Sequence, residues 1–106
     1  MSWHLNDDQL KLQAQARELA QQVIAPRAAE VDEAQEYPWA NVEALRDAGF
    51  TGMTVPAEFG GPGRSFLDAV LVVEEMAKVC GVTGRIAVEC NMGAISAVMA
   101  YGTHEQ

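Results

Sequence analysis

Two neighbouring segments, residues 66–80 and 84–101, restrict most strongly what this chain can fold into. Both have the composition of helices, and their apolar residues surround the helix axis instead of forming a single stripe. Eleven of the fifteen residues in the first segment are apolar. Helices of this kind lie inside larger assemblies. The rest of the chain predicts only one amphipathic and one short helix, so we expect polypeptide beyond this chain to cover them.

The first predicted helix begins with a capping box. Asn6 is followed three residues later by Gln9, so each side chain can bond the other's backbone amide. An apolar stripe then recurs at helical spacing. Pro26 lacks an amide hydrogen and should kink this helix, which we expect to resume toward Asp32.

Caps and breakers bound the remaining helices. Pro38 is placed at a first helical position, and Gly49 supplies a C-terminal stop. Residues 50–64 are rich in Gly and Pro and predict a turn-rich connector. Ser65 is expected to cap the third helix and Thr83 the fourth.

The last residues predict a further helix start. Gly102 ends the fourth helix, and Thr103 with Gln106 forms another capping-box pattern. The expected fold is therefore all-α, an up-and-down helical bundle fragment of about four helices plus the start of a fifth. We expect residues 1–106 to form one domain of a longer subunit.

Charge and cysteine content exclude several functional classes. Seven Lys and Arg residues against fifteen Asp and Glu give a net charge of −8, which disfavours binding to nucleic acid or to an anionic membrane surface. No apolar run is long enough to span a bilayer. Cys80 and Cys90 form no disulfide framework. These absences predict a cytoplasmic location.

Three short patterns invite a chemical interpretation that the residues do not support. Residues 60–65 suggest a phosphate-binding turn, but a proline removes one of the amide donors, which favours a plain turn. His4 and His104 lack metal-ligand spacing. Glu74 and Glu75 point about 100° apart on a helix, which favours surface or ion-pairing roles.

A stripe of mostly small residues on the fourth helix has two interpretations. Its members are Ile86, Glu89, Cys90, Gly93, Ala97 and Ala100, and the first four follow the i, i+3, i+4, i+7 pattern of one helical face. Small residues there can allow close helix packing, or they can leave room for an apolar ligand. The residues alone favour packing. A carboxylate on this stripe needs a polar partner nearby.

Several motifs in order carry a family resemblance. They are Val23-Ile24-Ala25-Pro26, Leu45-Arg46-Asp47-Ala48-Gly49-Phe50, Val55-Pro56-Ala57-Glu58-Phe59-Gly60-Gly61-Pro62-Gly63, Glu74-Glu75-Met76-Ala77 and Tyr101-Gly102-Thr103-His104-Glu105-Gln106. Their succession resembles the N-terminal domain of acyl-CoA dehydrogenases over essentially the whole chain.

The resemblance implies an FAD enzyme that removes α and β hydrogens from an acyl-CoA thioester. It also implies a homo-oligomeric subunit with a middle β domain and a C-terminal helical domain, which contain the flavin contacts and the catalytic carboxylate. We therefore assign no catalytic, cofactor-binding or metal-binding residue to this chain. The chain alone is not expected to be active.

The resemblance also selects between the two interpretations of the stripe. It implies that Ile86, Glu89, Cys90 and Gly93 belong to the wall around the acyl tail, and the glycine then predicts a deeper or wider pocket for a long or branched tail. The resemblance also implies electron-transfer flavoprotein as a partner that docks partly on the first and third predicted helices. Pro62 and Arg64 lie in the turn before the third of these helices.

Two alternatives stay open. One is a relative with other flavin chemistry, such as an acyl-CoA oxidase or a flavin-dependent monooxygenase. The other is a non-catalytic helical module that binds a partner protein or completes a split enzyme.

Overall fold

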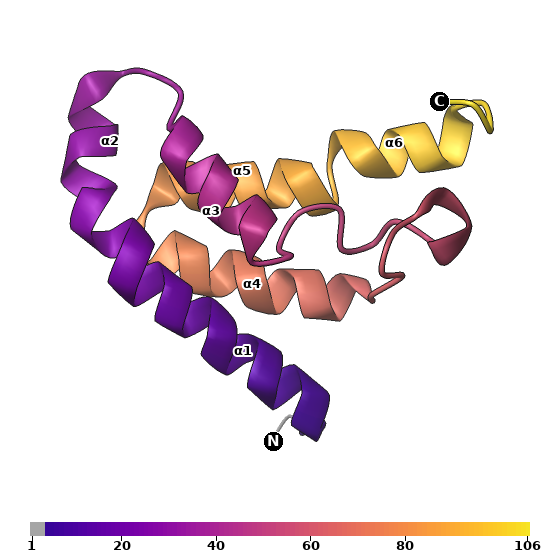
Figure 1. The fold of residues 1–106 in the computed structure, drawn as a ribbon, viewed down its shortest axis with the longest axis horizontal. Coiled ribbons are helices and arrows are strands. Elements are labelled where there is room, and N and C mark those ends of the chain that lie inside the picture. Colours follow the sequence, from indigo (N-terminus) through magenta and orange to yellow (C-terminus); the bar gives the residue numbers. More distant parts are fainter. Residues whose placement is uncertain (1–3) are drawn as a thin grey trace.

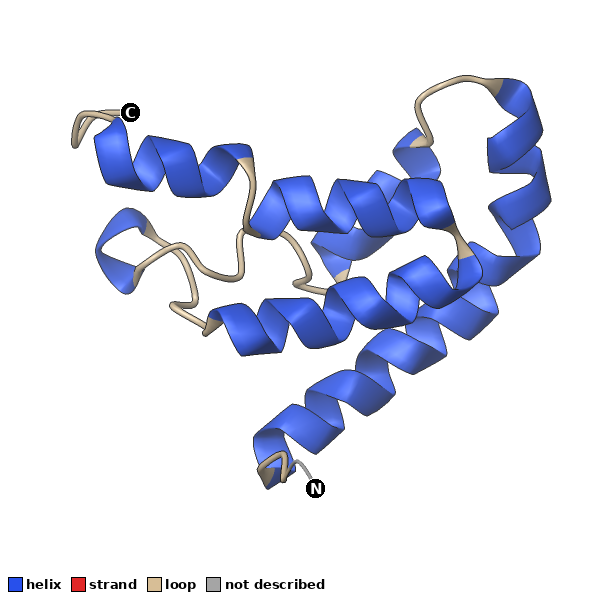
Figure 2. Ribbon diagram, turned by 180° about the vertical axis from the view of Figure 1, so that it is seen from behind, coloured by secondary structure: helices blue, strands red, loops and turns tan. Residues whose placement is uncertain are grey.

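The computed structural model describes residues 4–106, and every regular element in that range is helical (Figure 1). Figure 2 shows the same helices and the loops between them from behind. The elements are α1 (Asp7–Leu19), the π-helix η1 (Ala20–Ile24), the 3₁₀-helix η2 (Ala25–Arg27), α2 (Ala28–Ala34), α3 (Trp39–Asp47), the 3₁₀-helix η3 (Ala57–Phe59), α4 (Phe66–Val79), α5 (Gly81–Asn91) and α6 (Ala94–Tyr101). The all-α prediction is confirmed.

The first predicted helix is correct at both its cap and its kink. The Gln9 amide donates to the Asn6 side chain at 2.8 Å, and the Asn6 amide donates back to the Gln9 side chain at 3.1 Å. Next to Pro26 the α-helix widens to η1 and tightens to η2 before α2 resumes. The Ala25 amide accordingly bonds the Ala20 carbonyl, five residues back.

The second predicted helix ends where its glycine indicates. Gly49 has φ +82°, its amide bonds the Arg46 carbonyl, and the Phe50 amide bonds the Leu45 carbonyl. This is the Schellman pattern. The proline prediction is wrong by one residue, because Pro38 precedes α3 as its N-cap and does not occupy the first turn.

The prediction of one helix over residues 84–101 is wrong. The structure divides this segment into α5 and α6, with a break at Met92 and Gly93. Thr83 is also not a cap: α5 begins earlier, and the Thr83 hydroxyl lies buried, where it accepts from Asn41 and donates to Cys80. Apolar periodicity continues across the break, so the local pattern did not reveal it.

The core lies between α1, α4 and α5. In both views α4 and α5 run antiparallel side by side, joined at Cys80, and α1 crosses α4 (Figures 1 and 2). Helices α4 and α5 approach each other closely at Gly84, where a Cβ would lie 2.8 Å from Ala77. The buried apolar residues include Leu12, Ala16, Ala20, Ile24, Leu45, Phe50, Met53, Ala69, Val72, Met76 and Ala87.

Part of the apolar surface remains uncovered within the described residues. On α4, Phe66, Leu67 and Val70 are about half exposed, and α6 contributes no buried residue. The radius of gyration is 14.3 Å, whereas a compact domain of this length has about 13 Å. The expectation that the chain cannot enclose both apolar segments is therefore confirmed for these faces.

Candidate functional site

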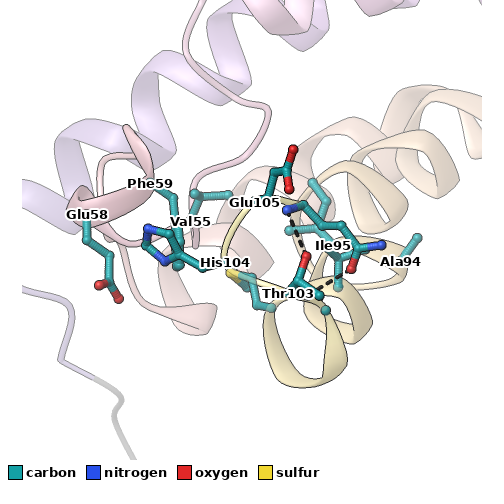
Figure 3. Close-up of a pocket in the computed structure, with 12 residues that line it drawn as sticks. Val55, Glu58, Phe59, Ala94, Ile95, Thr103, His104 and Glu105 are labelled. Carbon is teal, nitrogen blue, oxygen red and sulfur yellow. Dashed lines mark hydrogen bonds between the residues drawn. The ribbon is translucent and has the colours of Figure 1, made fainter.

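An open groove with a volume of about 740 Å³ lies between α6, η3 and the C-terminal turn. We call it the α6 groove. Figure 3 shows the loop carrying Val55, Glu58 and Phe59 on one side and α6 on the other. Its lining residues are Val55, Glu58, Phe59, Ala94, Ile95, Val98, Met99, Gly102, Thr103, His104, Glu105 and Gln106. The groove is mainly apolar, which suits packing against another apolar surface.

Local contacts shape one end of this groove. The Phe59 and His104 rings lie 5.0 Å apart between centroids. Both bonds of the predicted capping box are present: the Thr103 amide donates to the Gln106 side chain at 2.8 Å, and the Gln106 amide donates to the Thr103 hydroxyl at 3.2 Å (Figure 3).

Asn91, a residue that the sequence interpretation missed, ties α5 to the connector. It is fully buried. Its side-chain nitrogen donates to the Phe50 and Ala87 carbonyls at 2.9 Å, and its side-chain oxygen accepts from the Met53 amide at 2.9 Å. Its backbone carbonyl accepts from the Thr54 hydroxyl at 2.6 Å. An asparagine within an apolar helix was the only local signal, because its partners are distant in sequence.

The four predicted wall residues do not form one surface. Ile86 is buried in the core, and Cys90 packs against it from a partly buried position. Glu89 is exposed, and Gly93 lies beyond the end of α5 as the N-cap of α6. None of the four lines the α6 groove.

Glu89 and Gly93 are nevertheless in direct contact. A Cβ built on Gly93 would overlap the Glu89 carboxylate. That carboxylate also accepts from the Arg85 Nε at 3.2 Å, which supplies the polar partner predicted for it. We call Arg85, Glu89 and Gly93 the α5 stripe. The space left by the glycine is filled by the carboxylate, so this geometry does not support the expected extra room for a long or branched tail.

The Cys90 thiol is not prepared for nucleophilic chemistry. Burial raises its pKa, and the neighbouring Glu89 carboxylate raises it further. A thiol with a raised pKa stays protonated at neutral pH and is a weak nucleophile.

Four amides of the glycine-rich turn are already bonded to backbone carbonyls. The amides of Gly60, Gly61, Gly63 and Arg64 bond the carbonyls of Ala57, Pro56, Val55 and Met53. This confirms a plain turn. The turn therefore does not fit the phosphates of a flavin or of CoA. Among the described residues no group of His, Cys, Asp and Glu could hold a metal ion.

The paired glutamates have the structural roles predicted for them. Glu75 is buried and accepts from Arg17 at 3.0 Å and from Lys78 at 3.3 Å. Burial alone would raise the pKa of Glu75, but the hydrogen bonds from Arg17 and Lys78 outweigh it and lower the pKa. Glu74 is exposed and pairs with Lys78 at 3.7 Å. The contact between Arg17 and Glu75 joins α1 to α4.

None of the helices in residues 4–106 combines the length and hydropathy needed to cross a bilayer. The exposed α5 stripe and the α6 groove are the two surfaces with features suited to binding.

Comparison with known proteins gives a consistent result. The sequence profile described as "Acyl-CoA dehydrogenase, N-terminal domain" matches residues 6–106. The 3-sulfinopropanoyl-CoA desulfinase of Variovorax paradoxus is 64% identical over 98% of this chain and 26% of the relative. The short-chain-specific acyl-CoA dehydrogenase of Clostridium acetobutylicum is 35% identical over 100% of this chain and 28% of the relative.

A solved structure has the same fold. It was described in a study titled "Electron transferring flavoprotein of Acidaminococcus fermentans: Towards a mechanism of flavin-based electron bifurcation". It superposes with a TM-score of 0.85 at 32% identity, covering 99% of this chain and 28% of the other. The chain thus spans about a quarter of the length of the curated relatives it matches.

Proposed function

This chain belongs to the acyl-CoA dehydrogenase family as an N-terminal domain, and from that premise we propose that it forms part of the acyl-binding wall of a 3-sulfinopropanoyl-CoA desulfinase. The identity pattern carries the proposal. Four relatives named as this desulfinase are 54–64% identical to the chain, whereas three relatives named as acyl-CoA dehydrogenases are 33–35% identical.

The α5 stripe suits the substrate class that those names indicate. A 3-sulfinopropanoyl group is short and ends in an anion, so its binding site needs a cation more than it needs extra apolar depth. Arg85 is the cation of this stripe, and its side chain is 76% exposed. A guanidinium offers two parallel donors to a planar or pyramidal oxyanion. Glu89 holds Arg85 from one side and leaves its other donors free for the sulfinate.

Desulfination balances without an external electron acceptor. The C–S bond of the substrate is replaced by a C–H bond, and water supplies the oxygen and hydrogen needed to release propanoyl-CoA and hydrogen sulfite. FAD belongs to the complete subunit in this proposal and supplies redox chemistry where the family uses it. Because the turn amides are already bonded, we assign no FAD contact to this chain.

The complete subunit is proposed to be a cytoplasmic homo-oligomer. It would add a middle β domain and a C-terminal helical domain to residues 1–106, with the catalytic groups outside this chain. Those domains would cover the exposed faces of α4 and α6.

The second candidate is α,β-dehydrogenation with electron-transfer flavoprotein as acceptor. The 35% identity to a short-chain-specific dehydrogenase favours it. This reaction removes two electrons and therefore requires an acceptor, which separates it from desulfination.

The test uses the complete subunit with 3-sulfinopropanoyl-CoA and, separately, with butanoyl-CoA. We expect sulfite release from the first without added acceptor, and no turnover of the second with a ferrocenium acceptor. Acceptor-dependent oxidation of butanoyl-CoA without sulfite release would replace the proposal by the second candidate.

Arg85→Gln tests the role of the stripe. We expect it to raise KM for 3-sulfinopropanoyl-CoA by about tenfold or more, since a charge-assisted bond to the substrate is lost. Arg46→Gln is the matched control, because Arg46 is also exposed and pairs with a carboxylate, Asp47, at 3.3 Å. Equal KM values for the two variants would remove Arg85 from the binding site.

A further inference from the structure

We propose that Asn91 is a positioning residue, whose hydrogen bonds enforce the break between α5 and α6 and thereby orient the Arg85–Glu89 pair. This inference rests on the proposed binding role of the α5 stripe. It begins from a conflict between local sequence and structure. Residues 81–101 contain no proline and keep a helical apolar pattern across Met92 and Gly93, so the apolar periodicity favours one continuous helix.

Four hydrogen bonds from the connector, residues 50–64, oppose this preference. The Asn91 side chain uses both donors and its acceptor, and two of these three bonds reach the Phe50 carbonyl and the Met53 amide. The Thr54 hydroxyl bonds the Asn91 carbonyl, and the Gly52 amide bonds the Cys90 carbonyl at 2.9 Å. These carbonyls at the end of α5 are therefore bonded by the connector, where a continuous helix would bond them to α6.

The connector itself is fixed at a second point. The Met53 carbonyl accepts from the Arg64 amide at 2.7 Å, and the Val55 carbonyl accepts from the Gly63 amide at 2.8 Å. Since Ser65 then caps α4, the bonds of Asn91 attach the end of α5 to a segment anchored on the core.

The break determines how the stripe is arranged. Gly93 has backbone angles φ −74° and ψ −103°, outside the helical region. In this conformation the glycine lies against the Glu89 carboxylate, which bonds Arg85. If α5 continued straight through Gly93, this contact would change, and the carboxylate would no longer hold the guanidinium in the same place.

The first experiment compares Asn91→Ala with Asn41→Ala in the complete subunit. Asn41 is also buried and bonds a side chain of α5, Thr83, at 3.0 Å, but it lies away from the break. We expect Asn91→Ala to raise KM for 3-sulfinopropanoyl-CoA about tenfold with a smaller change in kcat, because misplacement of a binding group weakens substrate binding. Asn41→Ala should lower the melting temperature by about as much as Asn91→Ala does, but it should leave KM unchanged.

A second substitution separates positioning from general loss of packing. Ala94 is exposed and is the first residue of α6, where proline is tolerated, whereas proline at this position would interrupt a continuous helix. Adding Ala94→Pro to Asn91→Ala should therefore lower KM most of the way back to the wild-type value. A folded double variant whose KM stays elevated would overturn the proposal.

Hydrogen exchange of the same proteins gives a readout that does not need activity. In Asn91→Ala, protection should fall in residues 50–56 and rise at the amides of residues 93–95, which would gain helical partners. Unchanged exchange at 93–95 would also overturn the inference. If the alanine variant does not fold, Asn91→Ser replaces it in each comparison. Wild-type subunit that releases no sulfite would instead refute the proposed function and leave the exchange test valid.

Discussion

The burial of the consecutive helices α5 and α6 is the opposite of what their compositions predict. α6 contains no charged residue, whereas α5 carries Arg85 and Glu89. Yet α5 contributes five buried residues, Thr83, Gly84, Ile86, Ala87 and Asn91, and α6 contributes none. α5 lies along α4, while α6 extends beyond the end of the core (Figure 1). Burial in this domain follows the presence of a partner helix and not hydropathy alone.

Close approach between α4 and α5 explains the burial of α5. Gly84 faces Ala77 so closely that a Cβ would meet both the Cα and the Cβ of that alanine at 2.8 Å. A contact of this kind involves backbone on one side and cannot relax by rotating a side chain. The α4–α5 interface is thus the part of the molecule least tolerant of added volume.

Substitution at this contact should give the largest effect on stability. We expect Gly84→Leu to lower the free energy of unfolding by about 3 kcal/mol, because overpacking forces the two helices apart. Urea unfolding of the chain at neutral pH measures the change. Gly81→Leu is the control, since no atom lies within 4 Å of a Cβ at Gly81. Equal midpoints for the two variants would show that α4 and α5 do not approach as described.

The sequence predicted the features that depend on neighbouring residues. The capping box of Asn6 and Gln9, the stop at Gly49 and the disturbed helix next to Pro26 all arise within one helical turn. Each involves a local bond or a backbone angle that the residue type itself favours. Such features do not need the tertiary structure to be known.

The predictions that were wrong concern features that depend on contacts between residues distant in sequence. The break after Asn91 rests on bonds to residues 38 and 41 positions away, and the Thr83 hydroxyl is used by Asn41, 42 positions away. Of the four predicted wall residues, Ile86, Glu89 and Cys90 lie on α5, but the break places Gly93 beyond its end. Periodicity could not distinguish the core-facing Ile86 from the exposed Glu89, because both interpretations of the stripe required the same spacing.

The ion pairs of Glu75 stabilise the packed helices α1 and α4, and their loss should cost less free energy of unfolding than Gly84→Leu. Glu75→Gln should lower the free energy of unfolding by about 1–2 kcal/mol, since the bonds from Arg17 and Lys78 lose their charge assistance. Glu74→Gln, at an exposed and longer pair, should change it by about 0.5 kcal/mol or less.

The effect of Glu75 also has a defined dependence on pH. Its pKa in the folded chain is lowered from the ordinary value of 4.5, so the folded state favours the ionised form. The stabilisation is complete above that ordinary value and is lost as pH falls through the folded pKa. Urea midpoints of wild type and Glu75→Gln should therefore differ at neutral pH and converge as the pH falls below 4.5. A difference that grows on acidification would reverse the assigned direction.

The smallest effect on stability is expected on α6. Val98 is 49% exposed and Tyr101 is 91% exposed, so their replacement by serine removes little buried area. The free energy of unfolding of Val98→Ser/Tyr101→Ser should stay within about 0.5 kcal/mol of wild type. The same substitutions should reduce association of the chain in analytical ultracentrifugation, because they remove apolar surface that has no partner within the described residues. Destabilisation comparable to that of Gly84→Leu would mean that α6 packs against its own chain. The difference between α5 and α6 would then not come from the lack of a partner surface for α6.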